Sequence, residues 1–113
     1  MHTIAVTILR YVDNSQPGWV ECVFRDAWGR QHVFREKVPV VSTESLDAAS
    51  AYPQPGIIAC EIKKRWQDEK ARDLVTISTE RPWGCESIDG ATGFDVVTEQ
   101  LCNEQSDCDE RPR

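Results

Sequence analysis

The segment "GIIACEIKKRW", residues 56–66, carries the clearest strand pattern of this 113-residue chain. Its apolar residues Ile58, Cys60 and Ile62 alternate with other residues, and the same alternation continues to Trp66. Successive side chains of a β-strand point to opposite sides of a sheet, so a period of two indicates a strand with one buried face. The pattern therefore predicts a strand with one apolar face, and this face is expected to end at Trp66.

Five other segments show the same alternation. They cover residues 3–12, 19–27, 30–40, 73–80 and 93–101. The residues between them are rich in Asp, Asn, Pro and Gly, which favour the backbone conformations of turns. The stretch 42–55 begins with helix-capping residues but ends with two prolines, so it has room for one or two helical turns at most.

Five or six short strands with at most one short helix predict an all-β, mainly antiparallel fold. The order of the elements, with long hairpin strands first and short strands last, is similar to that of a small SH3-like barrel. A chain of this length buries about two thirds of its unfolded surface in one modest core. We expect a single barrel domain over residues 1–102, followed by an acidic C-terminal tail over residues 103–113.

The composition points to a cytoplasmic protein. No apolar run approaches the roughly 18 residues of a membrane-spanning helix, and the first residues lack the basic and apolar regions of a signal peptide. The five cysteines are an odd number without regular spacing, which disfavours a secreted disulfide framework. We therefore expect reduced thiols, and we expect Cys102 and Cys108 to be solvent-side thiols without a partner.

Negative charge is concentrated in the last quarter of the chain. The net charge is -6, and residues 86–110 contain eight acids and neither Lys nor Arg. This negative charge would repel the phosphate backbone of a nucleic acid, whereas it would attract a basic protein partner. Trp19 and Trp28 lie beside predicted turns, where they could either cover the end of the barrel or stand exposed as contact residues. The predicted partner-binding residues are therefore Glu86, Asp89, Asp95, Glu99, Glu104, Asp107, Asp109, Glu110, Trp19 and Trp28.

The segment "RPWGCESIDGATGF", residues 81–94, contains the most suggestive cysteine. A catalytic thiol needs a nearby base or cation to lower its pKa, whereas Cys85 is followed by acids. We interpret the segment as a bend in which Trp83 and Ile88 plug the end of the barrel.

We expect neither an enzyme nor a cofactor. No closely spaced cysteine pair indicates a metal site, and a thiol enzyme based on Cys85 is the remote alternative.

The segments "QPGWVECVFRDAWGRQHVFREKVPV" and "PQPGIIACEI…ERPWGCESIDG" occur in a short, acidic, single-domain chain. In general character this chain resembles the immunity proteins of bacterial polymorphic toxin systems, including contact-dependent growth inhibition. The resemblance implies an inhibitor that covers a cognate basic toxin domain, typically a nuclease. From the hydropathy and the negative charge we expect binding neither to a membrane nor directly to nucleic acid.

A second hypothesis is a small SH3-like accessory or regulatory module. Such a module would bind a peptide or a nucleic acid through its barrel face, with Trp19, Trp28, Lys63 and Arg65 as contact residues. The acidic tail would then be dispensable.

Overall fold

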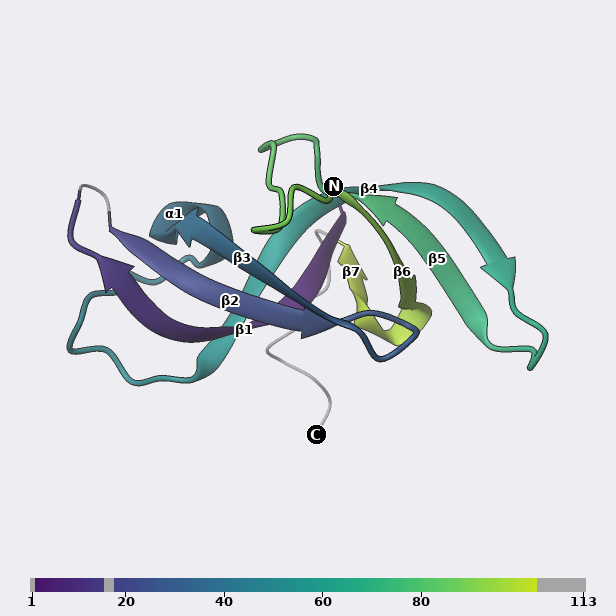
Figure 1. Cartoon of the computed structure of the whole chain (residues 1–113), viewed down its shortest axis with the longest axis horizontal. Helices are drawn as coiled ribbons and strands as arrows, with labels where there is room; N and C mark the ends of the chain where they lie inside the picture. The colour runs from purple at the N-terminus through teal and green to yellow at the C-terminus, as the bar shows by residue number, and fades with distance from the viewer. Residues whose placement is uncertain (1, 16–17, 104–113) are drawn as a thin grey trace.

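Seven strands form one antiparallel sheet in the computed structural model, which describes residues 2–15 and 18–103 (Figure 1). The strands are β1 (His2–Asp13), β2 (Trp19–Arg25), β3 (Gln31–Lys37), β4 (Gln54–Gln67), β5 (Asp73–Ser78), β6 (Gly93–Val97) and β7 (Leu101–Asn103). A four-residue helix α1 (Val38–Val41) follows β3, and a 3-10 turn η1 (Thr98–Gln100) follows β6. The prediction of a mainly antiparallel all-β chain with one short helix is confirmed, and β7 is a strand beyond the five or six expected.

Strand β4 links the two halves of the sheet. Its first half pairs with β1, from Gln54 opposite Ile8 to Cys60 opposite His2. Its second half begins at Glu61 and pairs with β5 instead. The strand order is therefore β3-β2-β1-β4-β5-β6, with β7 also paired to β1, and the sheet curls into a half-barrel (Figure 1).

Hydrogen bonds connect the two ends of this curled sheet. The backbone N–H of Ala27, in the β2–β3 turn, donates to the Asp95 carbonyl of β6 at 2.8 Å. The Gln100 side chain donates to the Arg25 carbonyl at 2.8 Å. In the loop before β6, the Ile88 N–H donates to the Val33 carbonyl of β3 at 2.8 Å. The β2–β3 hairpin is therefore held against the β6 end of the sheet.

The predicted core faces are confirmed except at the end of β4. The buried members are Ile4, Val6, Ile8, Val20, Cys22, Phe24, Ile58, Cys60, Val75, Ile77, Thr79, Phe94 and Val96. Ile62 is only half-buried, although it packs against this core. Phe24, Phe34 and Phe94 form an aromatic cluster in this core, with ring centroids 5.2–5.9 Å apart. Because Phe94 comes from β6 and the other two rings from β2 and β3, this cluster packs the two ends of the sheet together.

The short helix forms earlier than the sequence pattern indicates. We expected a strand to Val40 and helical turns only within 42–55, but β3 ends at Lys37 and the helix covers Val38–Val41. Pro39 lies in the first helical turn, where its missing N–H costs no hydrogen bond. Val38 and Val41 are buried, so packing on the core favours a helix over a continued strand.

A β-bulge changes the predicted face of β4. Ile62 lies opposite Ile77, but Lys64 lies opposite Thr76, so one extra residue is inserted in β4 at this point. Such an insertion reverses the side to which the following residues point. Trp66 therefore lies opposite Leu74, on the side away from Ile62, and the prediction that it ends the core face is wrong.

Gly56 marks the tightest approach of β4 to its neighbours. A Cβ atom there would lie 2.7 Å from Ile8 Cδ1 and 2.8 Å from the Val41 carbonyl oxygen. We expect Gly56→Ala to lower the free energy of unfolding by about 1–3 kcal/mol, because the core would be overpacked. Urea unfolding followed by circular dichroism measures this change.

Gly93→Ala is the matched control, because a Cβ atom there would have only the Ile77 carbonyl oxygen nearby, at 4.0 Å. We expect it to change the free energy of unfolding by about 0.5 kcal/mol or less. Equal effects of the two substitutions would contradict the packing described for Gly56.

Candidate functional site

The loop of residues 79–92, between β5 and β6, is anchored at its base by Thr79. This threonine is fully buried, and its hydroxyl donates to the Cys85 carbonyl at 2.6 Å. The Cys85 N–H donates back to the Thr79 carbonyl at 3.0 Å, and the Thr79 N–H donates to the Thr92 carbonyl at 2.8 Å. The two ends of the 79–92 loop are therefore fastened to each other.

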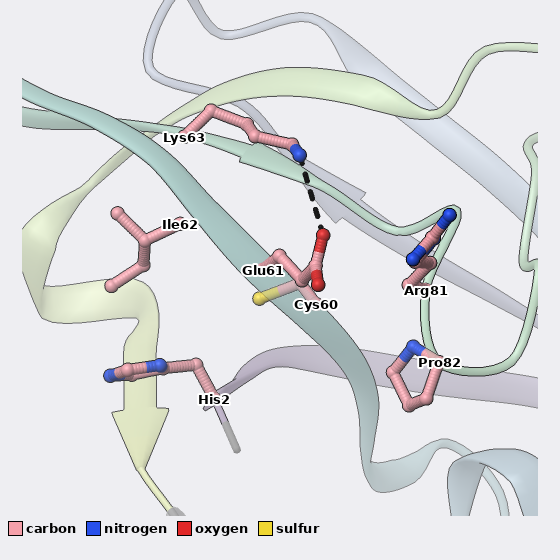
Figure 2. A pocket seen from close by; sticks show the side chains of 7 residues that line it. All are labelled: His2, Cys60, Glu61, Ile62, Lys63, Arg81 and Pro82. Carbon is pink, nitrogen blue, oxygen red and sulfur yellow. Dashed lines mark hydrogen bonds and ion pairs between the residues drawn. The ribbon is translucent and has the colours of Figure 1, made fainter.

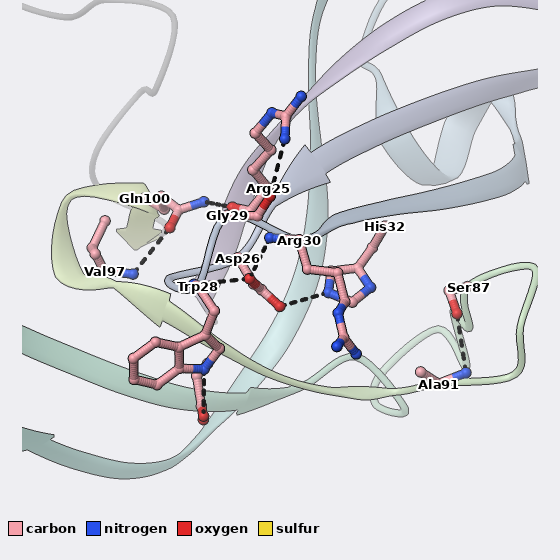
Figure 3. A network of polar contacts seen from close by, with 11 residues as sticks. Arg25, Asp26, Trp28, Gly29, Arg30, His32, Ser87, Ala91, Val97 and Gln100 are labelled. Atoms are coloured by element: carbon pink, nitrogen blue, oxygen red, sulfur yellow. Dashed lines mark hydrogen bonds and ion pairs between the residues drawn. The ribbon is translucent and has the colours of Figure 1, made fainter. Parts of the chain in front are cut away.

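The tip of the 79–92 loop is fastened as well. Ser87 N–H donates to the Ala91 carbonyl at 2.9 Å, and Ala91 N–H donates to the Ser87 hydroxyl at 3.1 Å, as Figure 3 shows for the second bond. Gly90 has a positive φ of 86° and closes the turn through a bond to the Ser87 carbonyl. Ile88 N–H donates to the Val33 carbonyl of β3 at 2.8 Å, so the loop is attached to the sheet.

The large apolar side chains of this loop point outward. Trp83 and Ile88 are each 60% exposed, so the prediction that they plug the end of the barrel is wrong. Cys85 and Ser87 occupy the inward positions, with exposed fractions of 0% and 4%. The reason is local: the hydrogen bonds of Thr79 draw the Cys85 backbone inward, and small side chains fit the space beneath the loop.

Two predicted partner-binding acids share this outward surface. Glu86 and Asp89 are exposed on the same loop as Trp83 and Ile88. Exposed large apolar residues on a hydrogen-bonded backbone are typical of protein-binding surfaces, because little order is lost when a partner covers them. We call these four side chains the loop surface.

The other predicted acids lie elsewhere. Asp95 is half-buried on β6, and Glu99 is exposed on η1. The 79–92 loop and η1 adjoin opposite ends of β6, which at about 3.3 Å per residue spans about 15 Å. Glu104, Asp107, Asp109 and Glu110 lie outside the described residues. Among the predicted partner-binding acids that the structure describes, only Glu86 and Asp89 therefore lie on one loop.

A second surface is built around Trp28 and Trp66, whose ring centroids are 6.4 Å apart. The Trp66 Nε1–H donates to the Thr76 hydroxyl at 3.0 Å, and that hydroxyl donates to Asp95 Oδ1 at 2.7 Å. The Trp28 Nε1–H donates to the other oxygen of Asp95 at 3.3 Å. This chain of hydrogen bonds holds Trp28 in place although it is 56% exposed.

Two cations cover the indole rings of this pair. Arg72 lies 5.4 Å from the Trp28 ring centre, and the Lys64 ammonium lies 5.2 Å from that of Trp66. Arg72 is also paired with Asp68 at 2.8 Å. Trp19 lies apart from this tryptophan pair and is half-buried, with the Lys37 ammonium 5.7 Å from its ring.

The turn that carries Trp28 is organised by Asp26 (Figure 3). Its carboxylate accepts hydrogen bonds from the N–H groups of Trp28 and Arg30 at 2.9 and 3.0 Å, and it lies 2.8 Å from His32 Nε2. Burial raises the pKa of Asp26, but the hydrogen bonds from His32, Arg30 and Trp28 outweigh this and hold the pKa below its usual value. The turn therefore has a fixed conformation around an ionised carboxylate.

Several residues of both surfaces were absent from the predicted site. Trp66 was missed because the bulge in β4 leaves no sign in the hydropathy pattern. Thr76 and Arg72 were missed because their contacts with Asp95 and Trp28 join segments that are distant in the sequence. Trp83 and Ile88 were assigned to the core because large apolar side chains are usually buried. The proline and glycine residues around them were the only sequence sign of an exposed loop.

The thiol of Cys85 is poorly suited to nucleophilic chemistry. Burial and, after it, the negative charge of the nearby Glu36 carboxylate, to which the thiol donates a hydrogen bond, together raise the pKa of Cys85 to about 12. Burial likewise raises the pKa of Cys22 to about 12 and that of Cys60 to about 11. At neutral pH these three thiols are protonated.

The expectation of reduced cysteines holds for Cys22, Cys60 and Cys85, which are free and buried. It is wrong for Cys102, which is buried on β7 and disulfide-bonded rather than a solvent-side thiol. Its position on a strand paired with β1 explains the burial. Cys108 lies outside the described residues.

Within residues 2–15 and 18–103, no three His, Cys, Asp or Glu side chains are grouped as metal ligands would be. The helices of the described chain include none of the length and hydropathy needed to cross a membrane. Comparison with models of protein families, with curated proteins and with solved structures finds no match to this chain.

The raised pKa of Cys85 predicts slow alkylation. In the native protein at pH 8 we expect iodoacetamide to modify Cys85 at least about 100-fold more slowly than in urea, because a thiol of pKa about 12 is almost entirely protonated there and is also inaccessible. Mass spectrometry of the Cys85 peptide measures the rate. Equal rates in the two conditions would show that the thiol is exposed.

Proposed function

We propose that this chain is a protein-binding inhibitor, acting as an immunity protein that neutralises a cognate basic toxin domain. The observation that supports it most directly is the loop surface, in which Trp83 and Ile88 are each 60% exposed beside Glu86 and Asp89. Tryptophan is among the residues that dominate binding energy in protein interfaces. The toxin as the partner follows from the resemblance in general character to immunity proteins.

The charge of the chain supports a basic partner. The net charge is -6, and the exposed carboxylates of Glu86 and Asp89 flank the two apolar side chains. Like charges on a partner would be repelled, whereas a basic surface would be attracted during the approach. Trp83 and Ile88 would then supply most of the affinity. Glu86 and Asp89 would raise the association rate and the selectivity for a basic partner.

A second candidate function is a module that binds a peptide or nucleic acid through its barrel face. The exposed Trp28, together with Trp66 and the cations Lys64 and Arg72, favours it. Bases bind such proteins by stacking on aromatic rings. Here a cation of the same chain already lies over each indole ring, so a base would compete with Arg72 or Lys64 for these positions. We therefore rank this function second.

The proposal predicts that the loop surface carries the binding energy. The partner to test is a basic toxin domain encoded by a gene next to that of this chain. Against it we expect Trp83→Ala to weaken binding by at least about 30-fold, equivalent to roughly 2 kcal/mol, and Ile88→Ala to weaken it less. Both side chains are 60% exposed, so the fold should tolerate their loss. Isothermal titration calorimetry measures the dissociation constants.

Trp28→Ala is the matched control, since Trp28 is 56% exposed on the other surface. We expect it to change the dissociation constant less than about twofold. A large loss with Trp28→Ala and none with Trp83→Ala would favour the second candidate function. No complex at micromolar concentration and low salt would overturn the proposed partner.

Charge reversal of the loop acids should slow association. We expect the double substitution Glu86→Lys and Asp89→Lys to lower the association rate constant by about tenfold at low salt, and by less at high salt because ions screen the attraction. The matched control is Glu44→Lys with Glu69→Lys, which changes the net charge equally at two exposed acids outside the loop. Stopped-flow fluorescence measures the association rate constants of the two double variants. If both variants associate equally slowly, Glu86 and Asp89 have no local role in attracting the partner.

A further inference from the structure

A groove lies where β4 leaves β1 and begins to pair with β5 (Figure 2). Its volume is about 740 Å³. Sites for small organic molecules typically enclose about 300–1,000 Å³, with mainly apolar walls and a few polar groups that orient the ligand. Cys60, Ile62 and Pro82 supply apolar surface to this groove.

Nitrogen-bearing side chains from three separate elements line the same groove. They are His2 of β1, Lys63 of β4 and Arg81 of the 79–92 loop. The single carboxylate in the lining, Glu61, lies 3.3 Å from the Lys63 ammonium, as the dashed line in Figure 2 shows. A chain with a net charge of -6 thus places more basic than acidic groups around this groove.

The donors of Arg81 and His2 are available to a ligand. Within the described part of the chain, neither side chain forms a hydrogen bond or ion pair with another residue. A guanidinium presents a planar set of N–H donors that matches a carboxylate or phosphate group with two parallel hydrogen bonds. The Lys63 ammonium adds a second charge, and Glu61 limits its movement.

We propose that this groove binds a small organic anion, in which a carboxylate or phosphate group is attached to an apolar body. The anionic group is bound by Arg81 and Lys63, and the body lies against Ile62 and Pro82. This binding is independent of the proposed inhibitor function, because the groove involves none of the four side chains of the loop surface.

Titration of the ¹⁵N-labelled full chain tests the proposal with four probes. Benzoate and phenyl phosphate carry the apolar body, and acetate and inorganic phosphate lack it. We expect the two aromatic anions to produce saturable amide shifts at residues 60–63 and 81–83, with dissociation constants of about 1 mM or tighter. Acetate and inorganic phosphate should bind at least about fivefold more weakly, because they leave the apolar wall uncovered. Binding of only one aromatic anion would support the site and identify the anionic group.

Two arginine substitutions separate a specific site from general charge attraction. We expect Arg81→Gln to weaken binding of the aromatic anions by about tenfold, since it removes charge-assisted hydrogen bonds. Arg65→Gln is the matched control: Arg65 is an exposed arginine of β4 that lines a separate hollow of about 360 Å³. We expect it to change the dissociation constants less than about twofold. Both side chains are exposed, so neither substitution should unfold the protein, and circular dichroism verifies this.

Three results would overturn the proposal. The first is the absence of saturable shifts with either aromatic anion up to about 20 mM, which is weaker than a specific site of this size should show. The second is equal weakening by Arg81→Gln and Arg65→Gln. The third is binding of acetate and inorganic phosphate as tight as that of benzoate and phenyl phosphate.

Discussion

The continuous pairing of β4, first with β1 and then with β5, is the constraint on which the rest of the structure depends. The strand is 14 residues long, and it changes its partner between Cys60 and Glu61. Each half of β4 is hydrogen-bonded to a different neighbour, so this strand holds together the two halves of a sheet that curls into a half-barrel. The aromatic cluster of Phe24, Phe34 and Phe94 then fills the space between the two ends of the curled sheet.

Each candidate surface follows from this curl. It brings β3 close enough to the 79–92 loop for Ile88 N–H to bond the Val33 carbonyl. It also brings the turn of Trp28 against β6, where Asp95 accepts the indole N–H. Residues far apart in the sequence thus fix the indole of Trp28 and the backbone of the loop that carries Trp83. Both side chains stay exposed on an ordered backbone, which suits a binding surface.

The strands and their core faces could be predicted because they depend on local alternation. Ile4, Val6 and Ile8 are buried as their period of two indicated, and the same holds on β2, β5 and β6. The candidate site could be predicted only in part. Glu86 and Asp89 were found through the charge pattern, whereas Trp83 and Ile88 were placed in the core. Hydropathy measures how apolar a side chain is, and it does not indicate whether the fold has space for it.

The sequence by itself determined the class of fold and the faces of most strands, since each depends on neighbouring residues. The raised pKa of Cys85 comes instead from burial and from Glu36 on β3, which only the fold brings close. Only the tertiary structure decided that α1 begins at Val38, that the bulge turns Trp66 away from the core, and that Cys85 instead of Trp83 lies beneath the loop. These outcomes depend on contacts between distant segments, whose free energies outweigh local preference. Such contacts exist only once β4 has joined the two halves of the sheet.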